Sequence, residues 1–138
     1  MLRFEIVLPT PNQVDDLYSL LSNRSHSISH NKLPSKKEHS EFVSQNPYLE
    51  WYLIYKDIDL VGSVNVHSDN SIGINVVEPN KDDLVEIISY IKSKYKPLPP
   101  IKSVRREDFF VNVASDNLEF IKIFQQLEKK EIQRSFVI

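Results

Sequence analysis

The sequence contains no cysteine and only two glycines, Gly62 and Gly73, among its 138 residues. Without cysteine the chain forms no disulfide, no thiolate metal site and no cysteine nucleophile. The scarcity of glycine excludes further classes of site, because the G-x-G-x-x-G, P-loop and G-x-S-x-G patterns need glycines at fixed spacing. The chain therefore lacks common signatures of nucleotide-binding and hydrolytic enzymes.

Long apolar runs and an excess of one charge are also missing. No stretch approaches the roughly 20 apolar residues that span a membrane, and residues 1–5 lack the pattern of a secretory signal. The formal net charge is −2, so neither nucleic acid nor a membrane is expected as a partner. The cytoplasm is the expected compartment. The length of 138 residues and the hydrophobic fraction of 41% predict one domain over residues 1–138.

What is present is a mixed pattern of strands and helices. Alternation and β-branched or aromatic runs predict strands over residues 2–8, 51–55, 60–66, 72–77, 109–113 and 132–138. Helical spacing predicts helices that follow Pro11, Ser35, Asn80 and Asn117. The order β-α-α-β-β-β-α-β-α-β predicts an α+β fold with a mostly antiparallel sheet and helices on both faces. The buried residues are expected to include Trp51, Leu53, Ile54, Val64, Ile74, Ile88, Phe110, Ile121 and Phe124.

Four segments in this order carry a family resemblance. They are "KKEHSEFV", "WYLIYKDIDLVGSV", "IGINVVEP" and, near the C-terminus, "VASDNLEFIKIFQQLEK". Together they resemble the GNAT superfamily of acyl-CoA N-acyltransferases, over nearly the whole chain. The resemblance implies that residues 72–77 and 109–113 form neighbouring parallel strands that splay apart, and that the chain is an N-acetyltransferase.

The chain also departs from the family pattern. In the family, the turn between the third meander strand and its helix has the form Q/R-x-x-G-x-G/A and binds the CoA pyrophosphate through backbone N–H groups. Here the segment reads "EPNKDDLVEI", with no glycine, although glycine is what lets a backbone curl closely around a phosphate. The tyrosine that protonates the departing thiolate in many members aligns with Phe124, and the closing "GF" with Glu128 and Lys129.

The resemblance also implies roles for individual residues. Acetyl-CoA would be the cofactor and a small amine the substrate. The contacts to acetyl-CoA would come from the backbone around Val76 and Val77 and from Asn80, Lys81 and Asn117. The proton of the amine would pass to His67 or Glu78. The alternative is a catalytically inactive GNAT-fold binding or regulatory module that has lost its CoA pyrophosphate loop. A homodimer is left open.

The turn at Asn80 has two interpretations. As a phosphate site, it offers the free N–H groups of a helix N-terminus and the charge of Lys81, and the helix dipole contributes about 0.3–1 kcal/mol to anion binding. As an ordinary capped helix, it uses Asp82 and Asp83 for its own stability. Both carboxylates are expected to repel a pyrophosphate.

The histidines and aromatic residues also have two interpretations. His26 and His30 stand four residues apart, but they lie in a Ser/Asn-rich segment without an adjacent carboxylate, so no metal site is expected. Aromatic residues crowd the segment around the second predicted strand, at Tyr48, Trp51, Tyr52 and Tyr55. They form either part of the core or the wall of an acceptor pocket.

Overall fold

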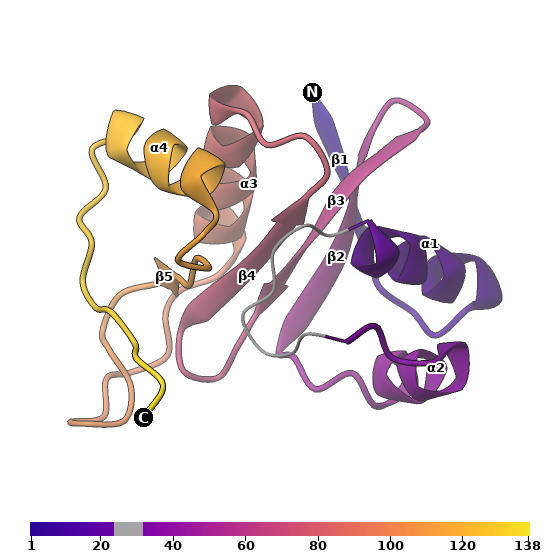
Figure 1. Ribbon diagram of the computed structural model, residues 1–138, viewed down its shortest axis with the longest axis horizontal. Coiled ribbons are helices and arrows are strands. Elements are labelled where there is room, and N and C mark those ends of the chain that lie inside the picture. Colours follow the sequence, from indigo (N-terminus) through magenta and orange to yellow (C-terminus); the bar gives the residue numbers. More distant parts are fainter. Residues whose placement is uncertain (24–31) are drawn as a thin grey trace.

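The computed structural model describes residues 1–23 and 32–138, which form one five-stranded sheet with four helices around it (Figure 1). The strands are β1 (Leu2–Ile6), β2 (Glu50–Lys56), β3 (Asp59–Val66), β4 (Ser71–Val76) and β5 (Phe110–Val111). The helices are α1 (Pro11–Ser22), α2 (Lys36–Gln45), α3 (Lys81–Lys94) and α4 (Leu118–Gln126). No helix within these residues is both long and apolar enough to cross a membrane.

The strands lie in the sheet in chain order, β1-β2-β3-β4-β5. The first four pair antiparallel, and β5 pairs parallel with β4 through Ser71 and Phe110 and through Ile72 and Val111. This confirms that residues 72–77 and 109–113 lie side by side in parallel. The strand within 109–113 is only two residues long.

The core has one part on each face of the sheet. On one face, Leu84, Ile87 and Ile91 of α3 and Phe120 and Ile123 of α4 pack against Tyr52, Ile54 and Val64. On the other face, Leu17, Leu20 and Val43 of α1 and α2 pack against Trp51 and Leu53. The expected placement of helices on both faces is therefore confirmed (Figure 1).

The predicted core set is confirmed for four of its six sheet residues, and its other five members are only partly buried. Trp51, Leu53, Ile54 and Val64 are buried, whereas Ile74, Ile88, Phe110, Ile121 and Phe124 are half-buried. Helices α3 and α4 are rotated about their axes relative to the predicted orientation. Ile87 and Ile91 of α3 are buried in place of Ile88, and Phe120 and Ile123 of α4 are buried in place of Ile121 and Phe124. A helix with apolar residues on a broad stripe leaves its exact rotation to tertiary packing.

The rotation of α4 sets the expected cost of truncating Phe124. Because Phe124 is half-buried, Phe124→Ala is expected to lower the free energy of unfolding by about 1–2 kcal/mol, less than the about 3–5 kcal/mol of a fully buried phenylalanine. Phe120→Ala is the matched control and should cost more, since Phe120 is 5% exposed. Urea unfolding measures both, and equal costs would contradict this packing.

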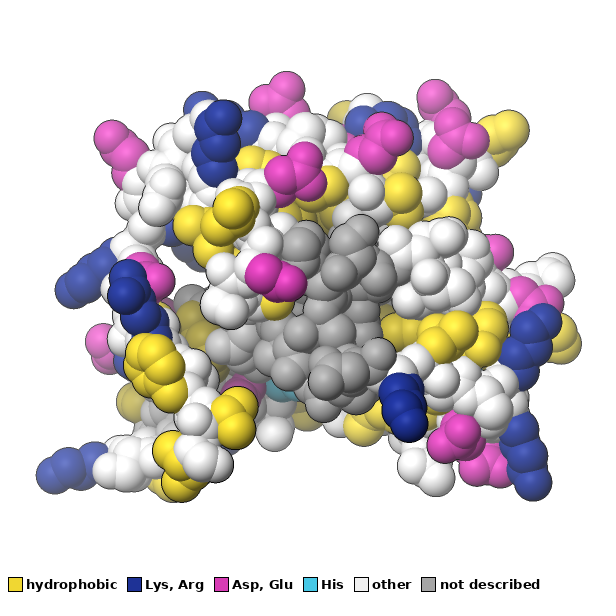
Figure 2. Space-filling view, viewed as in Figure 1, with side chains coloured by type: hydrophobic (Ala, Val, Ile, Leu, Met, Phe, Trp, Pro, Cys, Tyr) yellow, Lys and Arg dark blue, Asp and Glu magenta, His cyan; other side chains and the backbone are white. Residues whose placement is uncertain are grey.

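The strand predicted at residues 132–138 is wrong. The chain beyond α4 forms no strand, and its apolar side chains are exposed, Phe136 by 83% and Val137 fully. A strand needs a neighbouring edge to supply hydrogen bonds, and the edge strand that precedes it in the chain, β5, is only two residues long. Exposed apolar side chains are visible at the lower left of Figure 2, in the region where the chain ends in Figure 1.

Asn70 joins the β3–β4 turn to the connector that precedes β5. Its backbone is left-handed, with φ of 73°, and its side chain is almost completely buried. The side-chain Nδ2 donates to the carbonyls of Leu98 at 2.9 Å and Arg106 at 2.7 Å, and Oδ1 accepts from the Leu98 N–H at 2.8 Å. The Asn70 carbonyl also accepts from the N–H of Phe110, the first residue of β5. Asn70 therefore positions the only parallel strand among the described residues.

Candidate functional site

One side of β4 is open along most of its length. β5 pairs only with the first two residues of β4. The Val77 N–H donates to the Val61 carbonyl at 2.9 Å, and strand peptide groups alternate in direction, so those of Ile74 and Val76 point away from β3. No described residue pairs with the Ile74 and Val76 peptide groups on that side. Of the two valines expected from the sequence, Val76 therefore presents its N–H to the open side, whereas the N–H of Val77 is engaged.

The N-terminus of α3 lies directly after this open side. Asn80 caps the helix: its Oδ1 accepts from the Asp83 N–H at 2.9 Å, and its carbonyl accepts from the Leu84 N–H. The N–H groups of Lys81 and Asp82 have no partner within residues 1–23 and 32–138. Two backbone donors and the lysine side chain are thus available to an anion.

The two aspartates of this turn have different roles. Asp83 is buried, and its Oδ2 accepts from Asn80 Nδ2 at 2.8 Å and from Lys56 Nζ at 3.1 Å. Asp82 is exposed. The repulsion expected from both carboxylates therefore reduces to that of Asp82, because the charge of Asp83 is paired with Lys56.

The same turn does not form a phosphate-binding nest. The residues of positive φ are Asn46, Asp57, Asn70, Ser103 and Glu128, and none of them lies in residues 77–81. A nest needs successive N–H groups that converge through a left-handed residue. This turn therefore offers fewer donors than a glycine-rich loop would.

Next to the open side, the sheet face below α1 and α2 is apolar on β2 and polar on β3 and β4. Strand register places Trp51 of β2, Asn65 of β3 and Gly73 of β4 in one row across this face. Cross-strand partners share a face, and successive residues alternate. The polar part of the face, which we call the polar stripe, consists of Ser63, Asn65, His67, Ser71, Gly73 and Asn75. Sequence reasoning did not select Ser63, Asn65 or Asn75.

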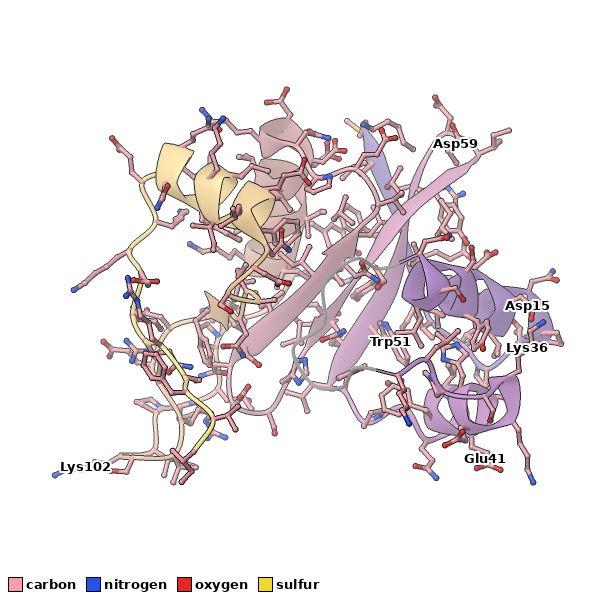
Figure 3. The ribbon with its side chains drawn as sticks, in the orientation of Figure 1. Asp15, Lys36, Glu41, Trp51, Asp59 and Lys102 are labelled. Atoms are coloured by element: carbon pink, nitrogen blue, oxygen red, sulfur yellow. The ribbon has the colours of Figure 1, made fainter. Side chains whose placement is uncertain are left out.

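An aromatic cluster borders the polar stripe. Tyr48 packs edge-on against Trp51 and His67, with ring centroids 4.8 Å apart in each case, and Phe42 of α2 packs against Tyr48 and Trp51 at 5.9 Å. Figure 3 shows Trp51 between the sheet and α2. Of the four aromatic residues that crowd this segment of the sequence, Tyr48 and Trp51 belong to this cluster.

The other two aromatic residues serve the structure elsewhere. Tyr52 faces α3, where its hydroxyl bonds to that of Tyr95. The Tyr55 hydroxyl donates to Asp16 at 2.8 Å, and burial together with this carboxylate raises the pKa of Tyr55 to about 12. Both hydroxyls are therefore engaged in structural hydrogen bonds away from the polar stripe.

His67 and Glu78 lie at opposite ends of β4. The His67 N–H donates to the carbonyl of Ser71, the first residue of β4, whereas Glu78 follows the last residue by two positions and is exposed. At about 3.3 Å per residue, Ser71 and Glu78 are roughly 20 Å apart. The structure therefore does not bring the two expected proton acceptors together.

His67 lies in an environment that suits a neutral base better than the exposed position of Glu78 does. It is half-buried within the aromatic cluster. Burial lowers the pKa of His67, and the carboxylate of Asp69 partly opposes this shift. The imidazole is therefore neutral at pH 7 and able to accept a proton.

Asn117 and Phe124 belong to α4. Asn117 Oδ1 accepts from the Phe120 N–H at 3.3 Å, so the side chain caps the helix and its Nδ2 remains a donor. Phe124 packs edge-on against Phe120 with ring centroids 6.1 Å apart. The position aligned with a thiol-protonating tyrosine is thus part of the apolar packing of α4.

A metal site finds no support in the described part of the chain. No group of three or more His, Asp or Glu side chains converges there. His39 is buried, and its Nε2 lies 3.2 Å from the Val14 carbonyl, so the neutral ring donates to it and serves as a core residue. His26 and His30 lie outside the described residues.

A hollow of about 290 Å³ is lined by Pro9, Pro11, Val14, Asp15, Tyr18, Lys36, His39 and Ser40. These residues all belong to α1, α2 and the segment before α1. Asp15 and Lys36 are labelled in Figure 3, on the side of the molecule away from α3 and α4. The hollow therefore does not include the open side of β4.

Three solved structures illustrate the likeness of this chain to known proteins. A domain from Methanocaldococcus jannaschii DSM 2661 aligns with a TM-score of 0.68 at 16% identity, covering 98% of this chain and 92% of that one. A ribosomal-protein-alanine N-acetyltransferase from Brucella melitensis biovar Abortus 2308 aligns at 0.60 and 11%, covering 100% and 98%. AAC(6')-Iy in complex with a CoA bisubstrate analogue aligns at 0.58 and 10%, covering 100% and 97%. Neither the scan of protein-family models nor the search of curated proteins found a match.

Proposed function

The chain has the fold of the GNAT acetyltransferases, and on this premise we propose that it transfers an acetyl group from acetyl-CoA to a small amine. The observation that carries the proposal is the open side of β4, where the Ile74 and Val76 peptide groups have no partner among the described residues. Unpaired strand N–H and carbonyl groups are what an extended ligand pairs with when it lies beside a strand. The N-terminus of α3 follows at the same end.

Acetyl-CoA, when bound, supplies an acetyl group activated as a thioester. The N–H groups of Lys81 and Asp82 and the Lys81 side chain would face its phosphates, and Asn117 Nδ2 is a further donor. The N–H groups of Val76 and Ile74 would bind the pantetheine arm. Of these, the donor nearest the thioester also polarises its carbonyl.

The direction of β4 then selects the base. Phosphate donors lie after the last residue of β4, so the reactive end of the ligand points toward its first residue, Ser71. His67 pairs with Ser71 through the backbone and lies on the polar stripe, whereas Glu78 lies at the phosphate end. We therefore assign His67 as the group that accepts the amine proton, directly or through water.

The second candidate is a binding or regulatory module without catalysis. It is favoured by one observation, that residues 77–81 form no nest and contain no glycine. Hydrogen bonds to a charged group contribute about 1.5–3 kcal/mol each, so a turn with two such donors fewer binds a pyrophosphate at least about 100-fold more weakly. The two candidates differ in whether acetyl-CoA binds and reacts.

We expect acetyl-CoA to bind with a dissociation constant of about tens of micromolar or weaker. Asp82→Asn should tighten binding by about 2–5-fold at low salt and by less at high salt, because it removes an exposed and screened repulsion. Calorimetry measures the affinity, and release of CoA thiol with a panel of small amines measures the reaction.

The matched control is Asp83→Asn. Because Asp83 is paired with Lys56 and Asn80, this change should lower the melting temperature and leave acetyl-CoA binding no tighter. Submicromolar binding by the unmodified chain would show that the turn holds a pyrophosphate without glycine. No binding by Asp82→Asn at low salt would favour the non-catalytic module.

A further inference from the structure

The connector between α3 and β5 contains a short segment that three prolines hold extended. The segment reads "KPLPPIK" over residues 96–102 and forms no helix and no strand. Proline fixes its own φ near −65°, and it also disfavours the helical region for the residue before it. Pro97, Pro99 and Pro100 therefore favour extended or polyproline II backbone over residues 96–100.

One edge of this segment is bonded to the rest of the chain. The Leu98 N–H donates to Asn70 Oδ1 at 2.8 Å, and the Leu98 carbonyl accepts from Asn70 Nδ2 at 2.9 Å. The Ile101 N–H donates to the Arg105 carbonyl at 2.9 Å, and Arg105 Nε donates to the Pro99 carbonyl at 2.7 Å. Because polyproline II has three residues per turn, Leu98 and Ile101 share an edge, and this edge is the anchored one.

The other two edges offer surface to a partner. Lys96, Pro99 and Lys102 share one edge, and all three are exposed. Pro97 and Pro100 share the other, where Pro97 is half-buried and Pro100 exposed. The carbonyls of Lys96, Pro97 and Pro100 pair with no described residue. These edges therefore combine proline rings with free hydrogen-bond acceptors.

Lys102 adds a positive charge at the end of the segment. Figure 3 shows its side chain at the lower left extremity of the molecule, pointing away from the sheet. No carboxylate within residues 1–23 and 32–138 lies within ion-pair distance of its ammonium group. With Pro97 and Pro100 three residues apart, the segment has the spacing P-x-x-P-x-K. Segments with two prolines at this spacing dock in grooves lined by aromatic side chains.

We infer that residues 96–102 form a docking segment for a protein partner whose groove is lined by aromatic side chains and ends at an acidic pocket, as in an SH3 domain. The ring of Pro100 and the exposed part of Pro97 pack against the aromatic side chains, and donors of the groove bond to the free carbonyls. Lys102 enters the acidic pocket. Because the segment is already extended and anchored at Asn70, binding loses little conformational entropy. This inference does not depend on the proposed acetyl transfer.

The test measures binding of the full chain to an array of purified SH3 domains that recognise P-x-x-P-x-K/R peptides. At least one domain should bind with a dissociation constant below about 100 μM by calorimetry. Lys102→Glu should weaken this binding by more than about tenfold, because it places like charges together in the pocket. Lys92→Glu is the matched control: Lys92 is exposed in the last turn of α3, and the same charge change there should alter the affinity by less than about twofold.

A second variant removes a ring without changing the charge. Pro100→Ala should weaken binding by more than about threefold, because it removes a contact and frees the backbone of the segment. Both Pro100 and Lys102 are exposed, so the variants should melt within about 3 °C of the unmodified chain. Chemical-shift changes in an isotopically labelled SH3 domain should lie in its aromatic groove.

Three outcomes would overturn the inference. The first is that every domain of the array binds the unmodified chain more weakly than about 100 μM. The second is binding that both Lys102→Glu and Pro100→Ala leave unchanged, since the contact would then lie elsewhere on the chain. The third is an equal loss with Lys102→Glu and Lys92→Glu, which would indicate a response to net charge rather than an acidic pocket for Lys102.

Discussion

Replacing His67 with glutamine is expected to lower kcat/KM by about 10²–10⁴-fold for any amine that the unmodified chain acetylates, the range typical of a lost general base. Glutamine keeps a polar side chain of similar length at the end of β3 but does not accept a proton near neutral pH. His67 pairs with Ser71 at the start of β4, away from the proposed phosphate donors at the N-terminus of α3, so the affinity for acetyl-CoA should change little.

The pH profile tests the same role independently. Only the neutral imidazole accepts a proton, so kcat/KM should fall as the pH decreases through the pKa of His67. Burial lowers that pKa from its usual value near 6.5, so the fall should lie below about pH 6.5, and His67→Gln should abolish it.

Glu78→Gln is the matched control for His67→Gln. Glu78 is exposed and lies at the far end of β4. This variant should therefore keep both the value of kcat/KM and its fall at low pH. If Glu78→Gln removes the fall of kcat/KM at low pH while His67→Gln does not, acetyl-CoA runs along β4 in the opposite direction from the one proposed.

Asn70→Ala is expected to lower the free energy of unfolding by about 3–4 kcal/mol. The change removes three hydrogen bonds, two to Leu98 and one to Arg106, at about 1 kcal/mol each. It also places alanine in a left-handed conformation with φ of 73°, which asparagine tolerates better. Such a loss is a large fraction of the stability of an ordinary domain, and chemical denaturation measures it.

Asn70→Gly separates the two causes. Glycine adopts the left-handed conformation freely and lacks the amide, so Asn70→Gly should lose only the hydrogen bonds. Its loss in free energy of unfolding should be about 1 kcal/mol smaller than that of Asn70→Ala. A cost below about 1 kcal/mol for Asn70→Ala would mean that the connector before β5 does not depend on this side chain.

Much of the fold was predictable because its signals are local. The meander of β2, β3 and β4 follows from runs of β-branched and aromatic residues divided by short turns. The capping box of α2 follows from Ser35 and Glu38, which are three residues apart and bond reciprocally in the structure. The predicted strand over residues 132–138 failed because its apolar residues have no edge long enough to pair with, and no local signal reveals that.

The site was predictable only in part, because register across strands is not a local property. Val76 belongs to β4, Asn80 and Lys81 begin α3, and His67 pairs with Ser71 at the start of β4, while their roles stay predictions. Asn65 went unselected, although the segment "SVNVH" alternates polar with apolar residues and so predicts a polar face on an otherwise apolar sheet. Its opposition to Trp51 and Gly73 follows from pairing between three strands, and only the structure shows it.

The strand order has a consequence for how the molecule folds. Because the strands lie in the sheet in chain order, the hairpins β2–β3 and β3–β4 close over short turns and cost little loop entropy. β5 follows a helix and a connector and pairs through only two residues, so we expect it to join the sheet last. The seam between β4 and β5 is therefore the least cooperative junction of the sheet, where amide protons should exchange with solvent first. A ligand that fills this seam would act on the folding equilibrium as a missing strand does, and would make the last step of assembly depend on its concentration.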